Sequence, residues 1–209
     1  MALDSYRNNA TPLLEKISKP FMRFNPNSIT IVSFILALLA GIVIALAGRL
    51  FSFYYDGLAF ALILLSSTLD AVDGFVARKR NISSRSGDML DHTFDRYSDI
   101  ALITGFSFSI FGNVYLGMLA LGGVFMTSYL GTQSQALGLK RNYGGLLGRA
   151  DRLAIMLVII LVELAFPFNL KFLIQITPVN LMLLWFLIAG YITSVERFSK
   201  SLKGLKEME

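Results

Sequence analysis

Residues 28–48 read SITIVSFILALLAGIVIALAG, a run of 21 residues without a charged side chain. An α-helix rises about 1.5 Å per residue, so about 20 apolar residues cross the roughly 30 Å hydrocarbon core of a bilayer. The run is therefore predicted to be a transmembrane helix.

Five further stretches follow the same pattern. Residues 89–111 and 153–168 fit it less well, because the first stretch contains charged residues and the second is short. The six predicted transmembrane helices are Ser28–Gly48, Phe51–Ala77, Met89–Phe111, Val114–Leu137, Leu153–Phe168 and Pro178–Val195.

The composition of the whole chain agrees with a membrane protein. Of the 209 residues, 55% are hydrophobic and 16% are charged, whereas about a quarter are charged in a soluble domain. This excludes a soluble globular protein, and also a disordered chain, a nucleic-acid-binding tail and a coiled coil, since each of these needs many charges. The length is that of one domain. We therefore interpret residues 1–209 as a single all-α membrane domain.

The N-terminal segment, residues 1–27, has no apolar core long enough for a cleavable signal peptide. Pro12 is tolerated in a first helical turn, and Leu13, Leu14 and Ile17 follow it. This pattern predicts a short amphipathic helix that lies on the membrane surface.

The positive charges predict the orientation. Sixteen of the 19 Lys and Arg residues fall on one side of the predicted bundle, and the opposite side has only Arg49 and Lys171, while Arg96 lies within the third helix. Cytoplasmic loops hold the excess of Lys and Arg. We therefore expect a multi-pass protein of the cell membrane, with six helices over residues 28–198 and with both termini, including the tail 199–209, in the cytoplasm.

Carboxylates cluster where the second and third predicted membrane helices meet, at their cytoplasmic ends. They are three residues apart on one helix and recur every four residues on the next, so that each set shares a helix face. Burying one such group costs about 2.5 to 3.5 kcal/mol, so compensating cations are required. The cluster contains six of the 14 acidic residues: Asp70, Asp73, Asp88, Asp91, Asp95 and Asp99.

One or two divalent cations that bridge the two carboxylate faces would satisfy this requirement. The chain has no Cys, and His92 is its only His, so the ligands are expected to be oxygens and the ion a hard cation such as Mg²⁺ or Mn²⁺. Two such ions form a clamp for phosphoryl transfer. Gly74 and Gly87 allow a close approach of backbone to ligand, and Arg78 can bind a phosphate through two parallel donors. Together these residues predict a diphosphate site.

The same residues resemble a known family. Asp70-Ala-Val-Asp73-Gly74-Phe-Val-Ala77-Arg78, followed after eight residues by Gly87 and then by Asp91 and Asp95 at intervals of four, is similar without departure to the signature of the CDP-alcohol phosphotransferases. That family has six transmembrane helices, a surface N-terminal helix and a cavity that faces the cytoplasm. The resemblance also implies a homodimer.

The resemblance implies a Mg²⁺-dependent transfer of a phosphatidyl-type group, either diacylglycerol phosphate or archaeol phosphate, from a CDP-lipid to an alcohol with release of CMP. Two ions are expected in each site. The implied metal ligands are Asp70, Asp73, Asp91 and Asp95. Asp95 would also take the proton of the attacking hydroxyl. The implied CDP-binding residues are Asn27, Thr30, Asp73, Gly74, Ala77, Arg78, Ser86 and Gly87.

A second group of cations lies between the fourth and fifth predicted helices on the cytoplasmic side, and it suggests a phosphorylated acceptor. The group comprises Lys140, Arg141, Arg149 and Arg152. Alternatively, these residues follow the rule for cytoplasmic loops or contact anionic headgroups. The stretch around Arg149 resembles that of the archaetidylinositol phosphate and phosphatidylinositol phosphate synthases, which implies inositol 1-phosphate as acceptor. Glycerol 3-phosphate and serine are the next candidates.

A cation channel or transporter is the main alternative from another functional class, because intramembrane carboxylates also line ion pathways. Such a protein spreads its acids over several helices and depths, whereas here they concentrate at one end of two helices. Three polar residues near the signature are interpreted as structural: Asp88 at a helix start, Asp99 as a partner of Arg96, and His92 in packing or a hydrogen bond.

Overall fold

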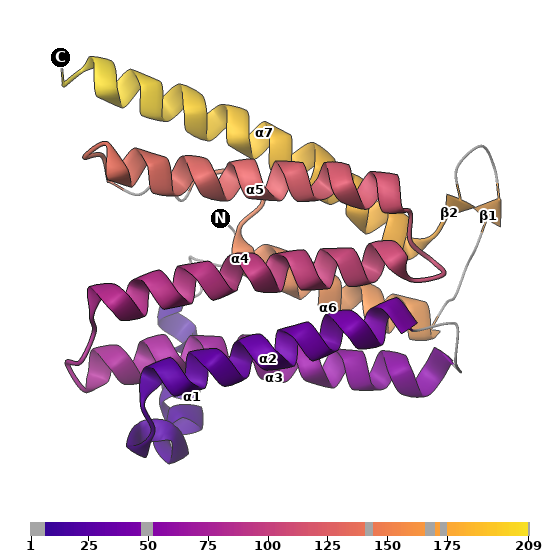
Figure 1. Cartoon of the computed structure of the whole chain (residues 1–209), viewed down its shortest axis with the longest axis horizontal. Helices are drawn as coiled ribbons and strands as arrows, with labels where there is room; N and C mark the ends of the chain where they lie inside the picture. The colour runs from indigo at the N-terminus through magenta and orange to yellow at the C-terminus, as the bar shows by residue number, and fades with distance from the viewer. Residues whose placement is uncertain (1–6, 47–51, 141–143, 166–169, 172–174, 209) are drawn as a thin grey trace. The chain divides into compact units, whose positions relative to one another are not determined.

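The computed structural model of the chain describes residues 7–46, 52–140, 144–165, 170–171 and 175–208. Those residues are mainly helical (Figure 1), and a two-residue antiparallel pair joins Leu170 to Ile176. The elements in chain order are α1 (Arg7–Ser18), the 3₁₀ helix η2 (Lys19–Arg23), α2 (Pro26–Leu46), α3 (Ser52–Lys79), α4 (Arg85–Phe108), α5 (Val114–Ala136), α6 (Arg149–Ala165), β1 (Leu170–Lys171), β2 (Gln175–Ile176) and α7 (Pro178–Lys206).

Each of the six predicted apolar stretches coincides with one of the helices α2 to α7. Within the described part of the chain, four of these helices are long and apolar enough to cross a membrane, namely α2, α3, α5 and α7. The other two are the helices whose sequences fit the pattern less well: α4 contains charged residues, and α6 has 17 residues. The predicted ends at Gly48, Phe51 and Phe168, and the loop cation Arg49, lie outside the described residues.

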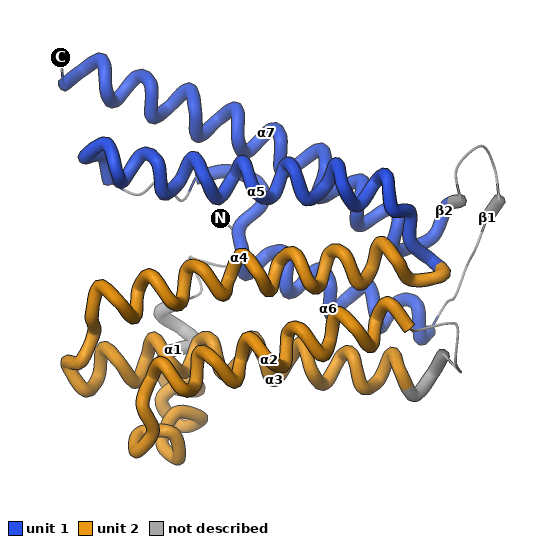
Figure 2. Tube along the Cα trace, viewed as in Figure 1, with its two compact units in different colours: residues 1–4, 111–209 blue, residues 5–110 orange. Residues whose placement is uncertain are grey.

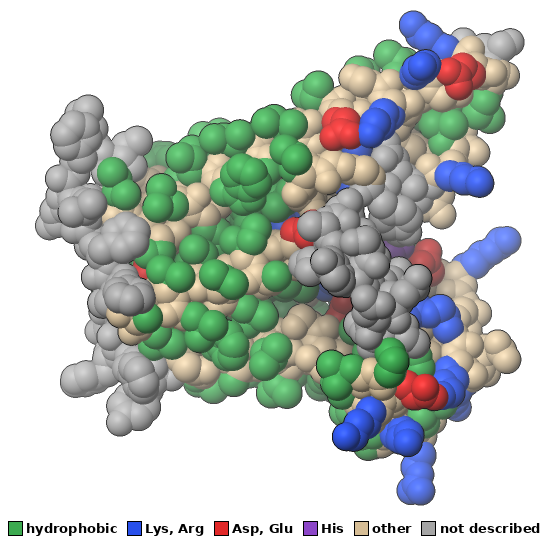
Figure 3. Space-filling view, turned by 180° about the vertical axis from the view of Figure 1, so that it is seen from behind, with side chains coloured by type: hydrophobic (Ala, Val, Ile, Leu, Met, Phe, Trp, Pro, Cys, Tyr) green, Lys and Arg blue, Asp and Glu red, His purple; other side chains and the backbone are tan. Residues whose placement is uncertain are grey.

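The chain forms two compact units (Figure 2). One unit comprises residues 5–110 with helices α1 to α4, and the other comprises residues 1–4 and 111–209 with helices α5 to α7. In each unit, hydrophobic side chains cover the middle of the face drawn in Figure 3, while Lys and Arg side chains gather toward one end. This distribution fits helices that carry apolar side chains into lipid and keep their charges in water.

In the unit of residues 5–110, α2 packs along both α3 and α4. Ser33 Oγ donates to the backbone oxygen of Ser66 over 2.9 Å, and Ser66 Oγ donates to that of Ser33 over 2.8 Å. This reciprocal pair ties α2 to α3. On the other side, Gly41 of α2 and Gly105 of α4 bring the two backbones so close that a Cβ on either residue would overlap a carbonyl oxygen of the facing helix.

The close approach of α2 and α4 predicts a large difference between two glycines. Gly41→Ala places a methyl group against the backbone of Ala101, and we expect overpacking to lower stability by about 1–3 kcal/mol. Gly57→Ala is the control, because a Cβ at this position would have no neighbouring heavy atom of the described residues within 4 Å beyond its own stretch of helix. Since Ala favours a helix over Gly by about 1 kcal/mol, we expect this variant to be at least as stable as the wild type. Thermal denaturation in detergent measures both effects. Equal midpoints for the two variants would contradict the packing described.

The N-terminal helices pack against the end of α3. Ile29, Val72 and Val76 form a buried cluster, and Leu14 and Phe21 pack on it. At the surface, Lys79 donates a hydrogen bond to Glu15, and this bond lowers the pKa of the Glu15 carboxyl below its ordinary value. Arg80 Nη1 donates to the backbone oxygen of Phe24 over 2.8 Å. These contacts fix the chain that leads from η2 into α2.

In the second unit, α5 packs along α7. Gly123 and Gly190 allow the close contact, and Thr127 Oγ1 donates to the backbone oxygen of Gly190 over 2.9 Å. α7 also holds the segment that leads into α6. Thr193 Oγ1 accepts a hydrogen bond from the backbone N–H of Leu146 over 3.0 Å, and Arg197 Nε donates to the backbone oxygen of Gly144 over 2.9 Å.

Candidate active site

A five-residue connection, residues 80–84, joins α3 to α4 and sets the relation between their carboxylates. The last turn of α3 closes with hydrogen bonds from Arg80 N to Val76 O over 3.0 Å and from Ile82 N to Ala77 O over 3.0 Å. Asn81 has a positive φ of 54°, a conformation that Asn tolerates better than most residues. Ser84 then caps α4.

The carboxylates of the two helices meet beside this connection. Asp70 and Asp73 of α3 and Asp91 of α4 each offer an oxygen, and these three atoms lie within 4.8 Å of one another. Asp91 also belongs to a second group, with His92 and Asp95, whose ligand atoms lie within the same distance of one another. All four predicted metal ligands therefore belong to two groups that share Asp91.

The first group fits a divalent cation. Its ligands are three carboxylates, the donors that hard cations such as Mg²⁺ and Mn²⁺ prefer. Asp73 is only 4% exposed, and its Oδ2 is buried without a hydrogen-bond partner among the described residues. A buried carboxylate oxygen without a protein donor is costly unless a cation, a water molecule or a proton satisfies it. A cation coordinated by Asp73 would meet this requirement.

A cavity of about 520 Å³ opens beside the first group, and Asp73 and Asp91 both line it. This volume is within the range of small-molecule sites. Six other residues predicted to contact CDP also line the cavity: Asn27, Thr30, Gly74, Ala77, Arg78 and Gly87. Ser86 is not among the described lining residues, and its Oγ lies 3.1 Å from Ser84 Oγ.

The two glycines of the signature are close to the polar groups of the cavity. A Cβ at Gly74 would lie 3.1 Å from Arg78 Nη1, so the guanidinium of Arg78 lies directly over the bare backbone. A Cβ at Gly87 would lie 3.2 Å from both Asn27 Oδ1 and Ser84 Oγ. The missing side chains leave room for these donors and acceptors, which fits the glycines of the pattern at both positions.

Further residues of the same unit line the cavity and were not predicted from the sequence. Ser84 is one of them, and its Oγ accepts a hydrogen bond from the backbone N–H of Gly87 over 3.0 Å. A serine three residues before Gly87 is typical of a helix N-cap, so that signal was present in the sequence. The full set is Arg23, Asn25, Pro26, Arg80, Ile82, Ser83, Ser84 and Asp88.

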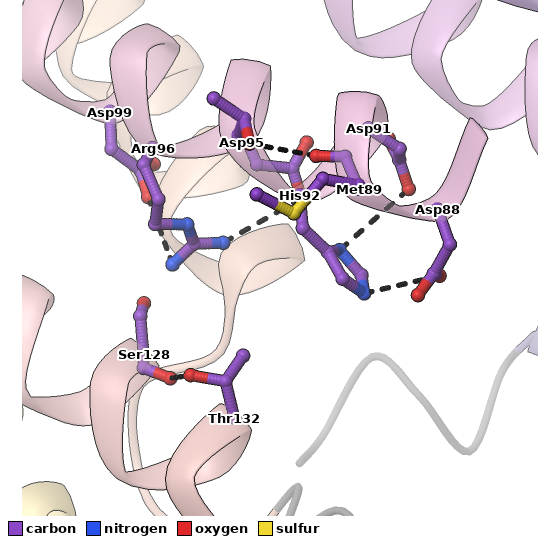
Figure 4. A network of polar contacts seen from close by, with 10 residues as sticks. Asp88, Met89, Asp91, His92, Asp95, Arg96, Asp99, Ser128 and Thr132 are labelled. Atoms are coloured by element: carbon purple, nitrogen blue, oxygen red, sulfur yellow. Dashed lines mark hydrogen bonds and ion pairs between the residues drawn. The ribbon is translucent and has the colours of Figure 1, made fainter. Parts of the chain in front are cut away.

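Two sets of polar contacts run along α4 (Figure 4). His92 Nε2 lies 3.4 Å from Asp88 Oδ1, and His92 Nδ1 lies 3.9 Å from Asp91 Oδ2. Arg96 lies between Asp95 and Asp99, as the sequence predicts for the Asp99 partner. The ring of His92, which the sequence predicts to be structural, thus lies between the carboxylates of Asp88 and Asp91.

The cations proposed for the acceptor lie in the unit of residues 111–209. Arg149 begins α6 and Arg152 follows one turn later, buried at 2% exposure, whereas Lys140 is exposed after the end of α5. Arg141 lies outside the described residues. Arg197 was not predicted as a site residue, but its guanidinium is buried and donates to backbone oxygens of residues 127 and 144.

Comparison with known proteins identifies the family. The sequence model of the CDP-alcohol phosphatidyltransferase family matches residues 23–194, which include every residue of the signature. The chain belongs to this family. It is therefore a transferase of the CDP-alcohol phosphatidyltransferase kind, embedded in a membrane.

Two relatives are similar to this chain over most of their length. An inner membrane protein of Escherichia coli, YnbA, is 32% identical over 68% of this chain and 72% of its own. An archaetidylinositol phosphate synthase of Pyrococcus horikoshii is 29% identical over 75% of this chain and 80% of its own.

The fold is that of the phosphatidylinositol phosphate synthase of Mycobacterium tuberculosis. Its crystal structure with CDP-DAG bound has a TM-score of 0.72 at 24% identity and covers 89% of this chain and 94% of its own. A structure of the same protein with manganese and citrate has a TM-score of 0.72 at 23% identity and covers 88% of each chain.

Proposed function

We propose that this transferase moves a phosphatidyl-type group, diacylglycerol phosphate or archaeol phosphate, from a CDP-lipid to inositol 1-phosphate and releases CMP. The observation that carries the proposal is the juxtaposition of the carboxylates of Asp70, Asp73 and Asp91 with a cavity of about 520 Å³ that Arg78 lines. Anionic ligands for cations and a cationic donor for phosphate at one place are what a nucleotide diphosphate requires.

We propose that the cavity binds the CDP moiety of the donor. Asn27, Thr30 and Gly87 would contact the nucleotide, while Arg78 would donate to a phosphate oxygen above Gly74. Ala77 would give a flat base room to lie against the helix. Ser86 would contribute indirectly to CDP binding, because its Oγ contacts the Oγ of Ser84, which lines the cavity.

We propose two Mg²⁺ or Mn²⁺ ions in each site. Asp70, Asp73 and Asp91 would hold one ion, and Asp91 and Asp95 would hold the other, so that Asp91 is shared. When bound, these ions supply positive charge that offsets the charge of the diphosphate and of the departing CMP. The manganese in the structure of the mycobacterial synthase supports this proposal.

The reaction needs one proton acceptor, and we propose Asp95. The acceptor hydroxyl oxygen forms a bond to the phosphorus that carries the lipid, and the bond from that phosphorus to the oxygen of CMP breaks. Asp95 receives the hydroxyl proton. Asp95 is buried and lies one helical turn from Asp91, so it is sheltered from bulk water yet adjacent to the proposed metal ligands.

We propose that residues 1–209 form one membrane domain of the cell membrane with six spans, α2 to α7, and with both termini and the active site on the cytoplasmic side. The distribution of Lys and Arg supports this orientation. The polar face of α4 would be turned toward protein, which allows a charged helix to cross the bilayer. The helix α1 would lie at the membrane surface, with Leu13 and Ile17 exposed toward the lipid. A homodimer is proposed by family resemblance.

Inositol 1-phosphate is the acceptor we favour, because the relative from Pyrococcus horikoshii is an archaetidylinositol phosphate synthase and because cations precede and begin α6. The test offers the purified enzyme a CDP-lipid and Mg²⁺ with inositol 1-phosphate, glycerol 3-phosphate, serine and free inositol in parallel, and measures CMP. We expect the fastest release with inositol 1-phosphate. Faster release with glycerol 3-phosphate, serine or free inositol would reject inositol 1-phosphate as the acceptor.

The acceptor site gives a separate prediction. Arg149→Gln is expected to raise the KM for inositol 1-phosphate about tenfold with little change in kcat, since it removes one charge-assisted contact to phosphate. Lys203→Gln is the matched control, because Lys203 is an exposed cation near the end of α7. An unchanged KM for Arg149→Gln would remove Arg149 from the proposed acceptor site.

A further inference from the structure

The polar face of α4 contains an ion-pair network that extends beyond the metal groups. Arg96 Nη2 lies 3.6 Å from Asp95 Oδ2, and Arg96 Nη1 lies 3.7 Å from Asp99 Oδ2 (Figure 4). The side chains of Asp95 and Asp99 are 9% and 2% exposed, and that of Arg96 is 25% exposed. One guanidinium thus lies between two nearly buried carboxylates.

Asp99 is distinct from the proposed metal ligands. It lies one helical turn beyond Asp95, and it belongs to neither of the carboxylate groups that could hold an ion among the described residues. A carboxylate buried in an apolar helix bundle needs a counter-charge, and Arg96 supplies it. Arg96 is thus one charged partner that links Asp99 to Asp95.

The shape of the Arg96 side chain allows it to constrain the orientation of a neighbouring carboxylate. The guanidinium is planar, and a carboxylate lies at ion-pair distance from each of its terminal nitrogens, so electrostatic attraction from both sides restricts how the group can turn. Asp95 itself has a soft terminal torsion, because rotation of a carboxylate about its Cβ–Cγ bond has a broad energy profile. A fixed cation beside Asp95 Oδ2 therefore limits how that carboxylate can turn.

We propose that Arg96, held in place by Asp99, is a positioning residue that fixes the orientation of the Asp95 carboxylate. The inference rests on the proposed function, in which Asp95 binds an ion and accepts a proton. In this arrangement Asp99 orients Arg96, and Arg96 orients Asp95. Residues that orient metal ligands typically change metal affinity or activity by about 10- to 100-fold when they are replaced.

A double-mutant cycle tests the order of action. We expect Asp99→Asn and Arg96→Gln each to lower kcat about tenfold with an unchanged KM for the CDP-lipid. If Asp99 acts through Arg96 as proposed, the double variant should be no slower than Arg96→Gln alone. Independent effects that multiply to about a hundredfold would overturn the proposal. Arg85→Gln, at the exposed start of α4, is the matched control.

Electron paramagnetic resonance can measure Mn²⁺ binding without substrates. This measurement distinguishes a positioning role of Arg96 from an effect of its positive charge alone. Removal of a positive charge beside a cation site should by itself tighten Mn²⁺ binding. If Arg96 positions Asp95, Arg96→Gln instead weakens Mn²⁺ binding about tenfold. Tighter or unchanged binding would overturn the proposal.

Arg96→Lys covers the case in which the other variants do not fold, because it keeps a cation beside the buried Asp99. The lysine lacks the planar fork, so we expect lower kcat and weaker Mn²⁺ binding, whereas wild-type values would contradict the positioning role. The proposed function is tested separately by the wild-type enzyme. If the wild type releases no CMP with any acceptor, the proposed function fails, and if an active enzyme gives multiplicative effects, only the inference about Arg96 fails.

Discussion

Asp95→Asn is expected to lower kcat about a thousandfold while the affinity for the CDP-lipid changes only a few-fold. General-base catalysis contributes about 10²- to 10⁴-fold, and an amide can neither accept the proton of the attacking hydroxyl nor replace the lost charge. The donor is expected to bind because Asp70, Asp73 and Asp91 form a group of their own beside the cavity. Release of CMP gives kcat, and binding of labelled CDP-lipid to enzyme in nanodiscs gives the affinity.

Glu196→Gln is the control for this experiment. It makes the same change from carboxylate to amide at an exposed ion pair with Lys200 on α7. We expect it to have wild-type kcat. Near-normal release of CMP by Asp95→Asn would refute the role of Asp95 as base, and loss of donor binding would place Asp95 among the residues needed to hold the donor.

Asp73→Asn is expected to abolish both turnover and donor binding. Asp73 belongs to the first carboxylate group and lines the cavity, and its Oδ2 is a buried oxygen with no hydrogen-bond partner among residues of the described ranges. Metal ions contribute several kcal/mol to such reactions, so we expect a loss of activity of at least about a thousandfold. Mn²⁺ titration should show weaker binding, and the labelled CDP-lipid should no longer be retained.

The two variants are expected to differ in donor binding, which Asp95→Asn retains and Asp73→Asn loses. Asp56→Asn serves as control for Asp73→Asn, because Asp56 lies on the same helix, 17 positions earlier in the sequence, and is not among the residues that line the cavity in the described part of the chain. If Asp73→Asn binds Mn²⁺ and CDP-lipid as the wild type does, the metal site proposed at the α3–α4 junction is wrong.

Much of the fold could be predicted from the sequence, because a membrane helix requires a long run of apolar residues. The positions of α2 to α7 follow from hydropathy, but their ends do not. α6 begins at Arg149 rather than Leu153, since Asp151 Oδ2 accepts a hydrogen bond from the backbone N–H of Gly148 over 3.0 Å and closes the first turn. α7 continues to Lys206, well past the apolar run that ends at Val195, because a helix can extend from lipid into water without a change in its backbone.

The site was predictable where its residues are close in sequence. The spacing of Asp70, Asp73 and Asp91 places them on two consecutive helices, and the structure brings their oxygens together. Arg23 and Asn25 line the same cavity, but they precede Asp73 by about fifty positions and carry no local pattern. Only the packing of the N-terminal segment against α3 brings them there. The same holds for Arg197, whose partners are 53 and 70 positions away.

The short connection at residues 80–84 has a consequence for how the donor lipid is captured. Its backbone and the Ser84 hydroxyl are engaged in the closing turn of α3 and the opening turn of α4. The two helices that carry the acidic groups are therefore joined by a short, hydrogen-bonded connection, and both pack along α2 (Figure 1). A ligand that meets a preorganised receptor loses little affinity to rearrangement. Lengthening this connection by a single glycine should consequently weaken binding of the CDP-lipid, even though every proposed ligand side chain is retained.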